Sequence, residues 1–160
     1  MNATDVMRYG HGTVLATLDG VPRPAWTTPG VCGVWSVKDI VAHLASYELV
    51  LGEVLAELSG ESGPTPLLDR FRDPASGFND AEVAARAGLT AEAALAEYVA
   101  AHERAMGLLA RIPATERTRP GTLPWYGAEY ALDDFVVYAF YGHKREHCAQ
   151  IAVFQDRLSG

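Results

Sequence analysis

The sequence has only two cysteines, Cys32 and Cys148, and they form no C-x-x-C motif. Two thiols so far apart in the chain indicate a reducing compartment rather than a disulfide scaffold. The chain also lacks an uncharged apolar stretch of about 18 residues, and its first residues show no basic segment followed by an apolar one. These absences predict no membrane span and no signal peptide, and they make a cytoplasmic location the default expectation.

Clusters of basic residues are missing as well. The chain has 13 Lys and Arg against 20 Asp and Glu, a net charge of −7 and a pI near 5.1. Without a basic patch we expect no nucleic-acid partner, and the acidity itself favours solubility without naming a partner. A G-x-S-x-G elbow is also absent, so nothing in the sequence indicates a Ser-His-Asp hydrolase.

Sustained strand alternation is absent, and helical periodicity takes its place. A length of 160 residues, 49% of them hydrophobic, fits a single domain, residues 1–160, with a sizeable core. Four long amphipathic helices are predicted, over about Thr4–Leu18, Ser36–Leu58, Thr90–Ile112 and Leu132–Leu158, with a short one at Asn79–Arg86 inside the long connection of residues 59–88. This pattern predicts an all-α fold, a four-helix bundle with long connections.

Local signals support these helices. Ser36 and Asp39 form a capping-box-like pair, and Thr90 is a good helix cap. The inward stripe predicted for the third long helix is Leu95, Val99, His102, Met106 and Leu109; that of the last is Leu132, Val136, Ala139, His143, His147, Ile151, Phe154 and Leu158.

His143 and His147 carry the most specific chemistry in the chain. Four residues apart on a helix, they share one face and lie about one turn apart. Imidazole binds zinc, nickel, copper or iron, and a shared ion removes the cost of burying two polar rings, about 1–3 kcal/mol each. His43, at the edge of the inward face of the helix over 36–58, is the candidate third ligand. Hydrogen-bonded core histidines are the alternative, and they are the expectation for His11 and His102.

Other interpretations of this segment are weaker. The string His143-Lys144-Arg145-Glu146-His147 fits H-x-x-E-H, the motif of inverted zinc proteases. That site needs a downstream acidic ligand, and only Asp156 follows, so we expect Glu146 to lie on the helix flank. Cys148 points about 100° away from His147, so we expect it to be buried by packing.

Two motifs together resemble the DinB superfamily. Residues 35–43, Trp-Ser-Val-Lys-Asp-Ile-Val-Ala-His, are similar to its W-[ST]-x-x-[DE] opening with a closing histidine, and residues 143–147 to its H-x-x-x-H motif. The resemblance implies a DinB-like bundle with long crossover connections, often a homodimer. It also implies a divalent metal, commonly zinc or nickel, held by His43, His143 and His147.

The resemblance further implies chemistry on small molecules. Relatives include transferases and isomerases that use mycothiol or bacillithiol, and a ClbS-like group that protects cells against reactive natural products. The Trp35 region and the single domain look closest to the ClbS-like group. Mycothiol-dependent maleylpyruvate isomerase departs from this chain, because it has glutamate at the position of His143 and carries a second domain.

The expected function is therefore that of a metal-dependent enzyme, a thiol-dependent transferase or hydrolase that acts on a reactive electrophile with a low-molecular-weight thiol as cosubstrate. Tyr47, one turn after His43, is the candidate proton donor or substrate-orienting residue. Trp125, Tyr126 and Asn79 are candidates for the substrate pocket. The alternatives are a protein that sequesters a small molecule without turnover, and a stress-associated dimer with a structural metal.

Overall fold

The computed structural model describes residues 2–160. Its helices are α1 (Ala3–Asp19), η1 (Arg23–Thr27, a 3-10 turn), α2 (Val37–Leu58), α3 (Pro66–Arg72), α4 (Phe78–Ala85), α5 (Ala91–Arg111), α6 (Ala114–Arg117), α7 (Leu132–Phe135), η2 (Val136–Tyr141, a π-helix) and α8 (Gly142–Ser159). In these residues the only β pairing is an isolated bridge between Cys32 and Trp35. The predicted all-α class is confirmed.

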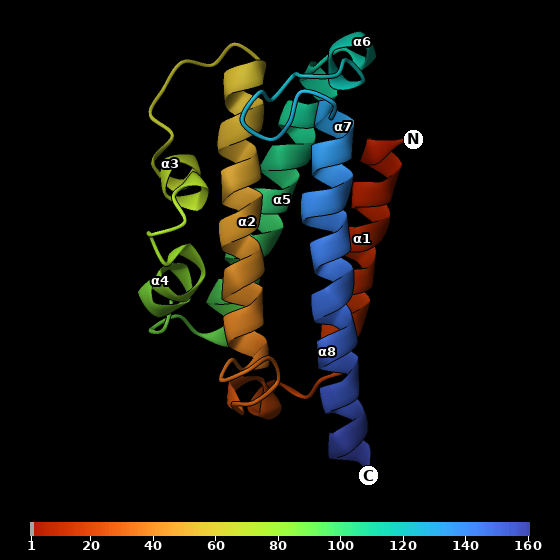
Figure 1. The fold of residues 1–160 in the computed structure, drawn as a ribbon. Helices are drawn as coiled ribbons and strands as arrows, with labels where there is room; N and C mark the ends of the chain where they lie inside the picture. Colours follow the sequence, from red (N-terminus) through yellow and green to blue (C-terminus); the bar gives the residue numbers. More distant parts are fainter. Residues whose placement is uncertain (1) are drawn as a thin grey trace.

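The four long helices α1, α2, α5 and α8 form the bundle, and they run side by side in Figure 1. α2 packs against α5, and α1 packs against the continuous rod of α7, η2 and α8. The long connection after α2 carries α3 and α4, which lie along the outer side of α2 (Figure 1). Among residues 2–160, no helix is long and apolar enough to cross a membrane.

The predicted helix starts are present. At α2, the Ser36 side chain accepts from the backbone N–H of Asp39, and the Asp39 carboxylate accepts from the backbone N–H of Ser36. At α5, the Thr90 hydroxyl accepts from the backbone N–H of Ala93. These caps satisfy backbone donors that lack a partner within the helix, and so they fix where each helix begins.

The apolar core is divided into two clusters by a band of polar residues. One cluster contains Met7, Val50, Leu109 and Phe140, and the other contains Val14, Ile40, Tyr98, Cys148 and Ile151. Between them along the four long helices lie the polar residues His11, Ser46, Glu48, His102, His143, Lys144 and His147, and His43 lies next to them, directly before Leu44 of the second cluster. We call this band the polar layer, and it places the chemically active side chains inside the bundle.

The stripe predicted for the last helix was wrong at Leu158, which is 47% exposed. Ala139 is half-buried and packs against the core, but the neighbouring Phe140 is the more deeply buried residue. The π-helix at 136–141 explains this difference, because a wider turn shifts the register of the residues that follow. On α5, Leu95, Val99 and Met106 are half-buried, while small residues such as Ala94, Ala101 and Ala105 face the core, which lets α5 pack closely against α2.

Candidate metal centre

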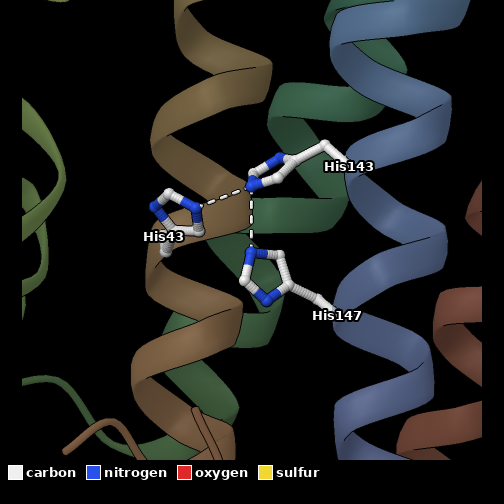
Figure 2. Close-up of side chains that lie close together, drawn as sticks. All are labelled: His43, His143 and His147. Carbon is white, nitrogen blue, oxygen red and sulfur yellow. Dashed lines mark hydrogen bonds between the residues drawn. The ribbon is translucent and has the colours of Figure 1, made fainter. Parts of the chain in front are cut away.

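Three histidine side chains converge in the polar layer between α2 and α8 (Figure 2). The Nε2 atom of His143 lies 2.8 Å from that of His43 and 2.9 Å from that of His147. One nitrogen of each ring lies within 4.8 Å of the other two. His43 and His147 are buried and His143 is half-buried.

All three imidazoles are held in the neutral form. Burial, together with the nearby His147, lowers the pKa of His43 to about 3. Burial and the neighbouring His147 and His43 likewise lower the pKa of His143 to about 3. Burial lowers the pKa of His147 as well, although Gln150 opposes this. Neutral imidazole is the form that binds metal, so the triad is ready for an ion near pH 7.

The tautomers also fit a metal. His147 donates through Nδ1 to the Gln150 Oε1, 2.8 Å away, which leaves the Nε2 lone pair directed at the other rings. A proton on His143 Nε2 can form a good hydrogen bond with only one of its two neighbours, His43 Nε2 or His147 Nε2. His43 Nδ1 is buried and has no hydrogen-bond partner within residues 2–160. The hydrogen-bonding capacity of the three rings is therefore not satisfied within the triad.

A divalent ion fits this donor set. Tetrahedral zinc, with Zn–N bonds of about 2.0–2.1 Å, places its ligand nitrogens about 3.3 Å apart. The distances from His143 Nε2 to the other two rings, 2.8 and 2.9 Å, are about 0.5 Å shorter than this value. Three protein ligands leave a further position for a ligand from solution, which is the pattern of catalytic zinc rather than of closed structural sites.

Aromatic rings surround the triad. The Trp35 ring lies 4.8 Å from that of His43, and the Tyr47 ring lies 4.7 Å from that of His43 and 4.3 Å from that of His143. Burial raises the pKa of the Tyr47 hydroxyl, with a smaller opposing effect of Asn79. Tyr47 therefore keeps its proton and can donate a hydrogen bond beside the triad.

A pocket of about 370 Å³ opens next to Tyr47. It is lined by Tyr47, Phe71, Phe78, Asn79, Asp73 and Asp80, together with Pro74, Ser76 and Gly77. Asn79 lies in the wall of this pocket, and its role as a substrate-pocket residue stays a prediction. Trp125 and Tyr126 pack on Phe135, at 5.4 and 4.8 Å between ring centroids, and they do not line this pocket.

The remaining candidates have other surroundings. His102 faces the Glu48 carboxylate, with 3.3 Å between Nδ1 and Oε2, and His11 Nδ1 lies 3.2 Å from the Tyr98 hydroxyl. These are hydrogen-bonded core positions, as expected for a histidine outside a ligand set. Glu146 is exposed and Cys148 is buried in the apolar cluster of Val14 and Ile40.

Glu48 and Lys144 are functional candidates that were not predicted from the sequence. Both are almost completely buried, at 1% and 2% exposure, and they form an ion pair between α2 and α8. For Glu48 a signal was present, because it lies between Leu44 and Leu51 on the apolar stripe of α2. Lys144 had no such signal, because the stripe predicted for the last helix passes through His143 and not through Lys144.

The fold and the triad together define a helical bundle of the DinB-like superfamily with a candidate three-histidine metal centre. Within that superfamily, the family model described as the mycothiol maleylpyruvate isomerase N-terminal domain matches residues 8–135, and the chain belongs to this family. The matched span contains His43 but ends before His143 and His147, so those two ligands rest on geometry. No match was found among the curated proteins or among the solved structures. The likeness to the ClbS-like group stays a prediction.

Proposed function

We propose that this protein is a metal-dependent enzyme that joins a low-molecular-weight thiol to an electrophilic small molecule. Membership of a mycothiol-associated, metal-binding family supports a thiol-related, metal-dependent function. The observation that carries the proposal is the convergence of three neutral histidine nitrogens beside an open pocket. A divalent ion such as zinc or nickel, when bound, supplies positive charge that favours a thiolate over a thiol.

The side chains around the triad have separate tasks in this proposal. His43, His143 and His147 hold the ion, and their burial excludes competing protons. Tyr47 keeps its hydroxyl proton because burial raises its pKa, so it orients the electrophile by a hydrogen bond or gives a proton to the product. Asn79, in the wall of the same pocket, offers both a donor and an acceptor to the substrate.

The charge of the pocket favours a particular class of substrate. Its lining, within residues 2–160, holds the carboxylates of Asp73 and Asp80 and no basic side chain. A dicarboxylate such as maleylpyruvate would meet repulsion there, since like charges at short range are unfavourable. A neutral or positively charged electrophile with an apolar part that packs on Phe71 and Phe78 fits better.

Bound metal is the first measurement. Elemental mass spectrometry on untagged protein is expected to find about one divalent ion per chain, and the ion should be lost in His43→Ala and in His147→Ala. His11→Ala is the matched control, because it removes a partly buried imidazole outside the triad. Absence of metal from the wild type after supply of zinc or nickel at neutral pH would refute the proposal.

Turnover is the second measurement. The metal-loaded protein is expected to consume a thiol in the presence of a neutral electrophile such as an epoxide, and mass spectrometry should detect the thioether. Metal binding without turnover across thiols and electrophiles would instead favour a protein that sequesters its ligand.

A further inference from the structure

The polar layer contains a chain of side chains drawn from all four bundle helices. Lys144 on α8 donates through Nζ to Glu48 on α2, and the other oxygen of Glu48 lies 3.3 Å from Nδ1 of His102 on α5. The His102 ring stacks on that of His11 on α1, with 3.9 Å between centroids and 7° between planes. The chain ends at the Tyr98 hydroxyl. None of these residues belongs to the histidine triad.

Stability alone does not account for the ion pair at the centre of this chain. Glu48 and Lys144 are 1% and 2% exposed. Removing two charges from water is costly, and well-packed apolar residues of similar volume are often as stable or more so. A fully buried pair does, however, impose one relative placement on the two helices that carry it, because any other placement leaves a charge unpaired.

The ion pair lies on the same two helices as the candidate metal ligands, so the helix placement that it imposes also places these ligands. Glu48 shares α2 with His43, and Lys144 directly follows His143 on α8. The pair therefore joins the same two helices as the triad, and at the same level of the bundle. The backbones of α2 and α8 approach each other at few positions, since α2 packs mainly on α5 and α8 packs mainly on α1. Apolar side chains of α2 and of the rod of α7, η2 and α8 meet in the two core clusters, on either side of the ion pair.

Both partners are held from a second side. His102 faces Glu48 from α5. On α1, Gly10 allows a close approach to α8, because a Cβ atom there would lie 2.9 Å from Cδ2 of Tyr141 and 3.7 Å from Cδ of Lys144. The stem of Lys144 is thus confined by α1, and the carboxylate of Glu48 is confined by α5, so the ion pair has little freedom to rearrange.

We propose that the buried Glu48–Lys144 ion pair is a positioning element that sets α2 and α8 so that His43, His143 and His147 converge before a divalent ion binds. The inference rests on the proposed metal centre. Both residues act through the helices and touch neither the ion nor the substrate. Pre-organised ligands lose less freedom on binding, and this raises the affinity for the ion.

The double variant Glu48→Gln/Lys144→Met tests this inference. It removes both charges together, keeps an oxygen to face His102, and leaves no unpaired buried charge. We expect its zinc Kd, measured by competition with a chromophoric chelator, to rise by about tenfold or more, as for other residues that orient metal ligands. Circular dichroism should show unchanged helix content.

Glu82→Gln/Arg86→Met is the matched control. Glu82 is also a buried carboxylate in an ion pair, 2.7 Å from Arg86, but it lies on α4 outside the polar layer. The control is expected to keep the zinc affinity of the wild type. An unchanged zinc Kd in the Glu48→Gln/Lys144→Met variant, or an equal loss in the control, would overturn the inference.

Hydrogen–deuterium exchange on the metal-free proteins separates this inference from the proposed function. Faster exchange over residues 142–159 in the double variant, with α5 unchanged, is the expected result. If the wild type binds no zinc, the proposed function fails by itself. Exchange then still decides whether the pair holds α8 against α2, and unchanged exchange would overturn that as well.

Discussion

We expect metal binding by the triad to be unusually tolerant of acid, because its imidazoles are held in the neutral form. An ordinary histidine has a pKa of about 6.5, and between pH 7 and pH 5 its protonation costs a metal site about 25-fold in affinity. For three such ligands, the metal affinity would fall by about 10⁴-fold over the same range. Here the pKa of His43 and that of His143 are lowered to about 3, so neither ligand gains a proton in this range.

Only His147 can contribute to the loss, and its pKa is lowered too. We therefore expect the metal affinity to fall by less than about 25-fold from pH 7 to pH 5. Competition with a chromophoric chelator, corrected for the protonation of the chelator, measures this ratio. His147→Ala, from which the ion should be lost, gives the background of this assay.

Calorimetry gives an independent check of the same reasoning. At pH 6, three ordinary histidines would release about two protons when an ion binds. The triad should release less than one, since only His147 can be protonated there. Titrations in two buffers with different ionisation enthalpies count these protons. A loss of affinity near 10⁴-fold, or release of two protons, would show that the imidazoles are not held neutral.

Three further predictions concern single features. The free energy of unfolding of the metal-free protein should fall as the pH falls from 7 to 5. His43 and His143 have lowered pKa values in the folded state, so the unfolded chain binds more protons over this range. Each residue then costs on the order of 1–2 kcal/mol of stability, which urea titration at both pH values would measure. Tyr47→Phe should lower kcat and leave metal stoichiometry unchanged, because the Tyr47 ring flanks the triad without ligating; loss of metal in this variant would contradict that role. Removal of metal by a chelator should lower Tm reversibly and leave helix content intact, since two apolar clusters hold the bundle together; unfolding on chelation would indicate a structural site.

The helices were predictable because their signals are local. Periodic apolar residues and the caps Ser36 and Thr90 mark where chain segments become helical, and the structure has them within a few residues of the predicted bounds. α3 was not predicted. Its seven residues follow Thr65, whose side chain makes no capping hydrogen bond. The backbone N–H groups of Leu67 and Leu68 instead donate to the Glu53 carboxylate of α2. Such a contact depends on tertiary structure and leaves no local pattern.

Which residues of the last helix face the core depends on the π-helix at 136–141, and hydrophobic periodicity in the sequence does not reveal a π-helix. Buried residues recur there every four positions, at Leu132, Val136, Phe140, Lys144 and Cys148. Steps of four drift by about 40° per turn in a regular α-helix, and the π-helix at 136–141 takes up part of this drift. A strict 3.6-residue period therefore selected Ala139 instead of Phe140.

The polar layer links these observations to function. A bundle built only for stability would fill its centre with apolar side chains, as it does above and below this level. Instead, each of the four long helices contributes an ionisable residue there: His11, Glu48, His102 and Lys144, besides the triad itself. The triad alone brings together only α2 and α8, so the involvement of α1 and α5 is not required for metal ligation. The contacts from α1 and α5 are required if the Glu48–Lys144 ion pair must itself be held in place. We assign to this pair the task of fixing the relative placement of α2 and α8.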